Sequence, residues 1–464
     1  MAAAGGVAFD LGLRGGVANA MVVAGIALVV VGLATDHRIA NRNARGLALA
    51  ALAPAAGLVL RASPWLVAAN LVAVSGLLSG AVAYSRSGSL TDTTLARLLR
   101  RLLATLPLAW SAPRLLAPLV PQPSERHADR ARAVGRALCL AVPVLAVVVA
   151  LLASADAVFA GLLTPDLHLG PITGHVVLAG AAALAVLAAI GTAAGDRVDP
   201  TPGGRFGAVE VTTMLGLAVA VLGLFSLAQL VALTGTGDRL VASSGLTPAE
   251  YARSGFFQLC WATAILLGYL GGVRALAAPG VTTRLAVRVL GALVPLLGLG
   301  LVAVSLRRMA LYDRAFGLTM LRLSVVGAAI WFGIVLGMVG LRNFGIGRGR
   351  EWVFAAAAGA ALTIVLVADA ANPEAFVVRH NLARSDVAVE LDTSYLRTLS
   401  DDAVPAIAAA AADADPLLRR QLLDAVRCGK DATGSAALNV SARRATDARR
   451  RQCEQAANAG RPSR

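Results

Sequence analysis

Charged side chains are scarce in this sequence of 464 residues, and lysine is almost absent. Only 15% of the residues are Asp, Glu, Lys or Arg, whereas soluble domains average about a quarter. The net charge of +15 comes from 41 arginines and the single lysine Lys430. A basic chain can bind nucleic acid, but these arginines mostly bracket apolar runs, as they do in membrane proteins. We therefore expect no nucleic-acid partner.

The sequence also lacks the short motifs of common catalytic and cofactor sites. It contains no GxxxxGK[ST], HExxH or CxxC motif. His168 and His175 lie seven residues apart, but a metal site needs further ligands, so we interpret them as interfacial histidines. We expect no catalytic residues, no cofactor and no metal.

Long apolar runs without charge are abundant instead. A helix needs roughly 17–25 apolar residues to cross a bilayer. Nine such intervals are bounded by Arg14 and Asp36, Arg61 and Arg86, Arg136 and Asp156, Asp166 and Asp196, Glu210 and Asp238, Arg253 and Arg274, Arg288 and Arg307, Arg322 and Arg342, and Glu351 and Asp369. A tenth, between Arg45 and Arg61, is short and contains Pro54, so a re-entrant or interfacial segment is its alternative. We predict an all-α, polytopic transmembrane helical bundle of about ten spans.

The predicted spans form two groups, followed by a tail. Residues 1–84 contain three candidate spans and residues 137–368 contain seven. Residues 85–136 between them include a basic amphipathic helix and several prolines, and we expect this linker on the cytoplasmic membrane surface. Residues 369–464 are less apolar and predict a small helical extramembrane domain.

The tail shows one clear helix start. Asp415 followed by Pro416 suits an N-cap and a first helical position. The predicted buried side of that helix consists of Leu417, Leu418, Leu422 and Val426. We expect two or three short helices, and a basic end of the chain, from Ala442 on, that frays.

The distribution of arginine predicts the orientation of the chain. Cytoplasmic loops carry the excess of Lys and Arg. With ten spans, the loops on one side hold twenty arginines and those on the other hold eight. The richer side is assigned to the cytoplasm. Both termini then lie outside the cytoplasmic (inner) membrane of a bacterium, a source that the composition rich in arginine and alanine also favours.

The four cysteines divide between spans and tail. Cys139 and Cys260 lie in apolar runs, where cysteine is a small hydrophobic residue. Cys428 and Cys453 lie in the tail, and an oxidising exterior would allow a disulfide between them. Free thiols on a cytoplasmic tail are the alternative, and they would reverse the orientation.

Four arginines cluster in RRMALYDRAFGLTMLRL, residues 307–323, on the side that should be poor in arginine. One interpretation is that the span count is wrong by one, or that arginines cap two helix ends. The other is an outward-facing cationic site with Asp313 as counter-ion, because guanidinium groups bind carboxylate or phosphate oxygens bidentately.

Several blocks of the sequence resemble one bacterial group. They are SADAVFAGLL, YARSGFFQLCWA, RRMALYDRAFGLTMLRL, NPEAFVVRHNLAR and LDTSYLRTLSDDAVPAI. In sequence and order they resemble the uncharacterised multispanning "domain of unknown function 4153/4173" group, over roughly Ala137 to Ile407. The resemblance implies an integral membrane protein and no settled activity.

Four of these blocks fall on the outer side in the predicted topology. They suggest one polar pocket beneath the tail, bordered by Tyr251, Arg253, Tyr312, Asp313, Arg314, Arg322 and Arg379. Charges in a low-dielectric setting must pair or face water. Pairing of Asp313 with Arg314 or Arg322 would make the pocket structural, whereas a small anion or a lipid headgroup would make it a binding site.

The favoured function is a non-enzymatic envelope sensor, scaffold or partner protein. Its expected partners are the lipid bilayer, an anionic headgroup or small anion, and another envelope protein. The alternative is a secondary transporter or permease for a small solute. Pro143 and Pro295 interrupt two spans, but we find no clear internal repeat. A membrane enzyme acting on lipid-linked phosphates is the third interpretation, and it lacks an obvious nucleophile or metal set.

Overall fold

The fold is helical throughout the described part of the chain. The computed structural model describes residues 18–35, 41–84, 126–156, 159–160, 206–232, 255–346, 352–384, 392–428 and 433–459. One isolated β-bridge, between Phe206 and Ala277, accompanies the helices there. The chain divides into two compact units. Unit 1 comprises residues 1–102, 316–324 and 354–464, and unit 2 comprises residues 103–315 and 325–353.

Among the described residues, eight helices are long and apolar enough to cross a membrane. They are Arg42–Leu60, Pro64–Ala83, Ala133–Ala155, Ala208–Val231, Phe256–Leu276, Leu285–Arg314, Met320–Asn343 and Trp352–Ala371. They coincide with eight of the ten predicted spans, including the doubtful one that contains Pro54. The chain is therefore a multi-pass helical membrane protein. The first predicted span is the shorter apolar helix Ala20–Thr35, and the one between Asp166 and Asp196 lies outside the described residues.

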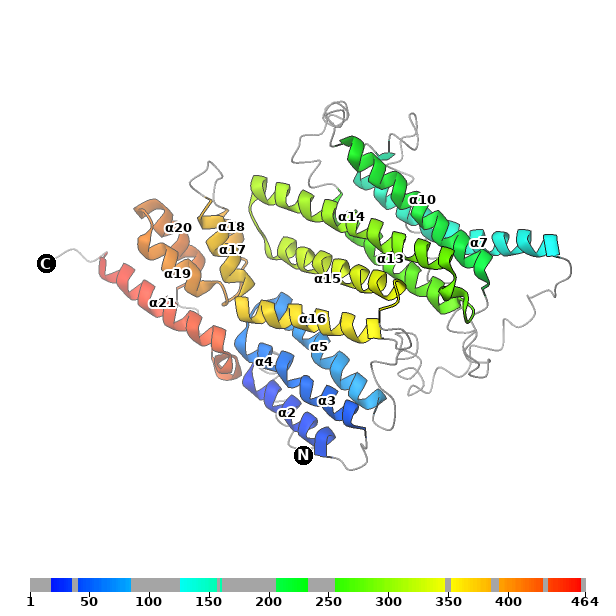
Figure 1. Ribbon diagram of the computed structural model, residues 1–464. Helices are drawn as coiled ribbons and strands as arrows, with labels where there is room; N and C mark the ends of the chain where they lie inside the picture. Colours follow the sequence, from blue (N-terminus) through cyan, green and yellow to red (C-terminus); the bar gives the residue numbers. More distant parts are fainter. Residues whose placement is uncertain are drawn as a thin grey trace. The chain divides into compact units, whose positions relative to one another are not determined.

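The membrane part of unit 1 contains α2 (Ala20–Thr35), α3 (Arg42–Ala50), α4 (Leu52–Leu60), α5 (Pro64–Ala83) and α16 (Trp352–Ala371). Figure 1 shows α2 to α5 as neighbouring blue helices, and α2 and α5 each pack against both α3 and α4. Ala48, Ala51 and Ala55 are fully buried at these contacts, since small side chains let helices approach closely.

The span Arg42–Leu60 has a local irregularity at Ala51, between α3 and α4, where the backbone stays right-handed helical with φ −65° and ψ −18°. Pro54 has no backbone N–H and is tolerated in the first turn of a helix but not in its interior. It stands third in α4, so the irregularity at Ala51 lies where its missing N–H leaves a gap in the helical hydrogen bonds.

The tail of unit 1 contains α17 (Pro373–Leu382), α18 (Thr393–Leu396), α19 (Val404–Asp413), α20 (Pro416–Val426) and α21 (Val440–Ala459). The predicted helix start is confirmed: the Asp415 carboxylate accepts the N–H groups of Leu417 and Leu418 at 2.9 and 3.0 Å. Of the four residues predicted to be buried, Leu422 and Val426 are fully buried, whereas Leu417 is 71% exposed.

The prediction that the basic end frays is wrong for residues 442–459, which belong to α21, and residues 460–464 lie outside the described residues. The inner face of α21 packs Ala445 and Ala448 into the tail core. A disulfide joins Cys453 in α21 to Cys428, with the Cα atoms 6.0 Å apart. Packing and the crosslink both hold the helix against the rest of the tail.

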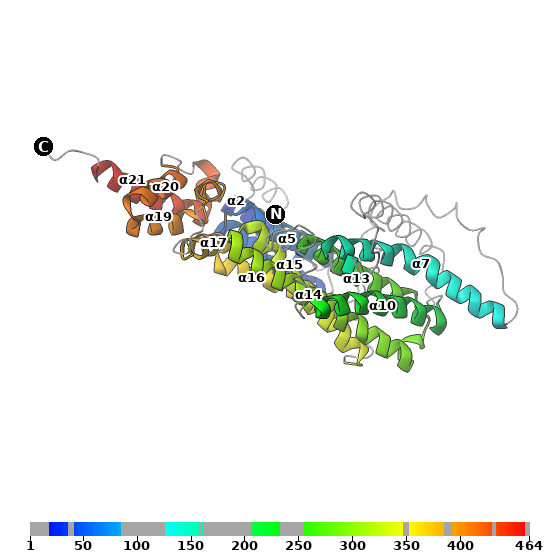
Figure 2. The same ribbon diagram turned by 90° about the horizontal axis from the view of Figure 1, so that it is seen from above.

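Unit 2 contains α7 (Arg126–Ala155), α10 (Ala208–Ala232), α13 (Phe256–Leu276), nearly all of α14 (Leu285–Phe316) and most of α15 (Met320–Asn343). Helix α7 begins ten residues before the boundary predicted for the linker. Both views show α7 beside α10 (Figures 1 and 2). Arg136 pairs with Glu210 at their starts, and Gln229 donates to Asp156 near their ends, so the two helices run in the same direction.

Candidate functional site

Asp402, in the turn before α19, is the centre of a polar junction in unit 1. Its side chain is fully buried and accepts the N–H groups of Ala62 and Ser63 at 2.9 and 2.7 Å. The Ser441 hydroxyl donates to its other oxygen, and Arg61 Nη1 lies 3.9 Å from that oxygen. Hydrogen bonds to an ionised acceptor are about twice as strong as neutral ones. One carboxylate thereby joins the α4–α5 connection to the tail.

Asn439 is the second fastening point of the junction. As the N-cap of α21, its Oδ1 accepts the N–H groups of Ser441 and Ala442 at 2.9 and 3.1 Å. Its Nδ2 lies 2.9–3.1 Å from the carbonyl oxygens of Ala18, Leu58 and Arg61. The carbonyls of Leu58 and Arg61 lie at the end of α4, where a helix leaves such groups unpaired, and that of Ala18 precedes the start of α2. The tail and the start of α2 therefore lie at one end of unit 1.

Arg61 completes the junction by capping α16. Its Nε donates to the carbonyl of Asp369 at 2.5 Å and its Nη2 to that of Ala370 at 3.2 Å. A guanidinium at a helix C-terminus satisfies orphan carbonyls and complements the helix dipole. The ends of α4 and α16 and the start of α5 consequently meet beneath the tail.

An ionisable side chain lies inside the span just before this cap. Asp369 is 5% exposed, and its Oδ1 accepts Asn70 Nδ2 from α5 at 3.0 Å. Within the described structure, Asp369 Oδ2 and Asn70 Oδ1 have no hydrogen-bond partner. A Cβ atom at Gly57 of α4 would overlap both side chains. Gly57 thus makes room for a polar pair among spans, where ionisable groups are rare and usually functional.

Glu374 is a third buried carboxyl near the junction. It stands in the first turn of α17 and accepts the N–H and the hydroxyl of Ser400 at 2.8 and 2.7 Å. Burial raises the pKa of Glu374 above its ordinary value, and the hydrogen bond from Ser400 opposes this to a smaller extent. Proton binding by Glu374 is therefore coupled to the position of the 400–402 turn, whose Ser400 donates to this carboxyl.

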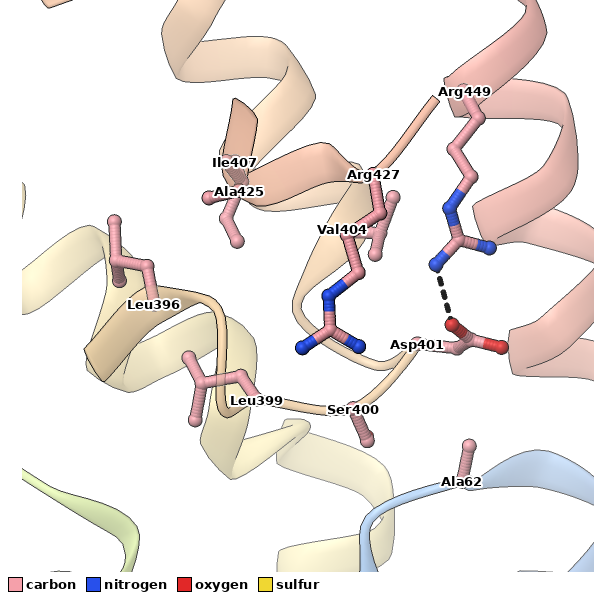
Figure 3. Close-up of a pocket in the computed structure, with 10 residues that line it drawn as sticks. All are labelled: Ala62, Leu396, Leu399, Ser400, Asp401, Val404, Ile407, Ala425, Arg427 and Arg449. Carbon is pink, nitrogen blue, oxygen red and sulfur yellow. Dashed lines mark hydrogen bonds and ion pairs between the residues drawn. The ribbon is translucent and has the colours of Figure 1, made fainter. Parts of the chain in front are cut away.

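Two cavities are lined by described residues of the tail in unit 1. The smaller, of about 200 Å³, is shown in Figure 3 and lies between the 399–401 turn and the α20–α21 helices. Its charges are occupied: Arg449 pairs with Asp401 at 2.6 Å and donates to the carbonyl of Val426, and Arg427 donates to the carbonyl of Arg397. We interpret this smaller cavity as part of the tail core.

The larger cavity, of about 530 Å³, borders the polar junction, and we call it the cationic cavity. Its lining consists of Arg61, Asn372, Ala375, Arg379, Leu382, Asp402, Pro405, Ala406, Ala409, Ala410, Asp413, Ser441 and Arg444. Arg379 and Arg444 are exposed. Within the described part of the chain, neither guanidinium has a carboxylate at ion-pair distance. The cationic cavity is therefore the candidate binding site.

In unit 2 a buried ion pair involves the arginine cluster. Arg308 is 4% exposed and donates to Asp156 and, at 2.5 Å, to the carbonyl of Ala155. Asp156 also accepts Gln229 Nε2 and the N–H of Phe159, at 2.8 and 2.9 Å. Sequence reasoning missed this pair because its partners are 152 residues apart, although both belong to blocks that carried the family resemblance.

The far end of the arginine cluster, in unit 1, is bound by the tail. Gly317 turns the chain with φ 71°, a left-handed conformation that glycine adopts without a Cβ penalty. Asn381 accepts the N–H of Leu318 and donates to its carbonyl, both at 2.8 Å, and the Tyr395 hydroxyl accepts the N–H of Met320 at 2.7 Å. Three of the resembling blocks therefore meet in this unit.

The seven residues of the predicted pocket fall into three groups. Tyr251 and Arg253 lie outside the described residues, and Tyr312, Asp313 and Arg314 lie on α14 in unit 2. Arg322 belongs to unit 1 and donates to the carbonyls of Phe316 and Gly317, so it caps a helix end. Arg379, also in unit 1, lines the cationic cavity. A single pocket formed by all seven stays a prediction.

Comparison with known proteins identifies one family. The family described as "Domain of unknown function (DUF4153)" matches residues 47–410, which is well over half of the chain. Searches of curated proteins and of solved structures returned no match.

Proposed function

This chain belongs to the family described as "Domain of unknown function (DUF4153)", and from that premise we propose that it is a non-enzymatic protein of the bacterial envelope. In this proposal the helical tail is a rigid platform that senses or binds another envelope component at the membrane surface. The spans anchor the platform, and the cationic cavity is its binding site.

The observation that carries this proposal is the polar junction. Asp402 and Asn439 together bind backbone groups at the start of α2, the end of α4 and the start of α5. A tail that only connected the membrane part to something else would need no such fastening. Buried polar groups that are fully paired hold one arrangement of their neighbours, which a sensing or docking surface requires.

Two observations support a tail outside the cytoplasm. Disulfides persist in oxidising compartments, and Cys428 and Cys453 are joined. The contact of Asn439 with Ala18 brings the beginning of α2 to the tail end of unit 1. Both agree with the orientation predicted from arginine, in which the two termini are extracytoplasmic.

Thiol labelling in intact spheroplasts tests this orientation. After mild reduction, a membrane-impermeant maleimide should label Cys428 and Cys453 in intact spheroplasts, and the C428S/C453S variant should show only background. Labelling that appears only after lysis would overturn the proposed orientation.

Site-specific photo-crosslinking tests the binding of a partner. A crosslinker at Leu417, which is exposed on the tail, should yield a defined product with an envelope component.

A secondary transporter is the second candidate, and the Asp369–Asn70 pair is the observation that favours it. Transporters bind ions and substrates where helices are interrupted inside the membrane. The span formed by α3 and α4, with its irregularity at Ala51, contributes Gly57 directly against this pair. In pyranine-loaded proteoliposomes, a transporter should show proton flux in a phosphate or chloride gradient, and Asp369→Asn should abolish it. The platform function predicts no flux from either protein.

A further inference from the structure

We infer that the cationic cavity binds the phosphodiester headgroup of an anionic lipid, with Arg379 and Arg444 as its anion ligands. This inference names a ligand for the binding site in the proposed function, and it rests on that proposal for the role of the cavity as a binding site. It holds whichever side of the membrane the tail faces.

The first argument is uncompensated charge. Arg379 extends from α17 and Arg444 from α21, and both line the cavity. The buried carboxylate of Asp402 lies 3.9 Å from Arg61 Nη1, so its charge is offset by Arg61 and not by Arg379 or Arg444. Asp413 is the other acid on the lining. With Arg61 paired to Asp402, the two exposed arginines Arg379 and Arg444 remain against the single carboxylate of Asp413, and the cavity favours an anion.

The second argument is the place of the cavity relative to the spans. Asn372 follows the end of α16 directly, and Arg61 lies between the end of α4 and the start of α5. Both residues line the cavity, so it lies at the depth where spans leave the hydrocarbon. Trp65, in the first turn of α5, is 48% exposed, as is typical of residues at the membrane interface. A lipid phosphate is at this depth, and its acyl chains extend along the spans.

The third argument is the fit of volume and ligand chemistry. A volume of about 530 Å³ falls in the usual range for small-ligand sites, about 300–1,000 Å³. Ala406, Ala409 and Ala410 form part of the wall, and their small side chains leave the space open. Arginine presents a planar fork of donors that matches two phosphate oxygens at once. Two such forks from different helices suit a phosphate better than a single carboxylate.

The experiment compares lipids on the purified full-length protein by native mass spectrometry and thermal denaturation in detergent. Wild type should bind dioleoyl-phosphatidylglycerol at least about ten-fold more tightly than dioleoyl-phosphatidylcholine, because the choline ammonium of the second lipid places a positive charge beside Arg379 and Arg444. The R379Q/R444Q variant should lose this preference. The matched control R420Q/R451Q removes two exposed tail arginines outside the cavity and should keep it.

Further arms separate the possible sources of phosphate. Inorganic phosphate and glycerophosphoglycerol should stabilise the protein far less than the intact lipid; equal protection by either would overturn a lipid ligand. Equal affinity of wild type for the two lipids would overturn the inference altogether, as would a preference that R379Q/R444Q retains. If that variant does not fold, R444Q alone and the wild-type comparison still decide. A tail shown to be cytoplasmic would overturn the proposed orientation but leave this result standing.

Discussion

At the scale of single residues, several polar side chains are buried in apolar surroundings, and each depends on one or two neighbouring residues for its hydrogen bonds. Asn70 shows this clearly. It lies in a run that contains no charge, and a count of charged residues passes over it, yet it is fully buried and binds Asp369. An uncharged amide inside an apolar run was the signal available in the sequence. Its partner, 299 residues away, was not.

The residue opposite this pair provides a stability test. Gly57→Ala should lower the thermal midpoint in detergent, because the new Cβ overlaps Asp369 Oδ2 and Asn70 Nδ2 and overpacking costs about 1–3 kcal/mol. Helix propensity alone would favour alanine by about 1 kcal/mol. The matched control is Gly76→Ala in α5, where nothing lies within 4 Å of the Cβ position. A Gly57→Ala protein as stable as the control would contradict the packing described for this pair.

Glu374 provides a pH test outside the spans. The pKa of Glu374 is raised in the folded tail, chiefly by burial and further by Asp402. The folded tail therefore binds the proton of Glu374 more tightly than the unfolded tail does. The contribution of the protonated Glu374 to the stability of the tail is fully present below the ordinary Glu pKa of about 4.3. It is lost as pH rises through the raised pKa. Protease resistance of the tail should decline over that window in wild type and less in Glu374→Gln. The exposed Glu454→Gln should behave like wild type, and an identical decline in all three would exclude Glu374.

At the scale of elements, buried ion pairs decide which helices lie together. In unit 2, Arg308 of α14 and Asp156 after α7 pair with both side chains almost fully buried. Sequence reasoning placed Arg308 in a cluster and proposed Asp313 as the counter-ion. The cluster instead divides between an ion pair in unit 2 and a turn held by the tail in unit 1. Local spacing could not predict this division, because helix α14 presents successive residues to different neighbours.

The pair can be tested by a double-mutant cycle. Removing one partner leaves a buried charge, so Asp156→Asn or Arg308→Met alone should destabilise the protein by about 3–5 kcal/mol. The double variant should be less destabilised than the sum of the singles, since neither charge then remains. Arg136→Met is the comparison: the Arg136 side chain is 63% exposed although its partner Glu210 is buried, so the loss should be smaller than for either partner of the fully buried pair. Additive effects at Asp156 and Arg308 would show that they do not interact.

At the scale of the whole molecule, the direction of each span sets the topology. Eight described helices qualify as spans, and α7 and α10 run in the same direction. The predicted span between Asp166 and Asp196 would give these two helices that common direction. The prediction itself falls outside the described residues and stays a prediction.

Reporter insertion tests this topology in cells. A periplasmic-activity reporter inserted after His168 should be active and one inserted after Gly203 inactive, because a span between them places the sites on opposite sides. The same pair of insertions with a cytoplasmic-activity reporter should give the inverse pattern. If both insertions lie on the same side, the predicted span between Asp166 and Asp196 does not exist. The orientation assigned to the spans before it would then change.

The sequence by itself determined that this protein is a multi-pass helical membrane protein and where most of its spans lie. Hydrocarbon solvation depends on local composition, so a run of about twenty apolar residues is sufficient evidence for a span. The N-cap at Asp415 was equally predictable, since a cap involves only neighbouring residues. Only the tertiary structure decided that Asp402, Asn439 and Arg61 hold the tail. It also decided that Arg308 binds Asp156 and that Arg379 and Arg444 line the same cavity. Those contacts join residues from distant parts of the chain, and no local pattern records which buried polar group will find which partner.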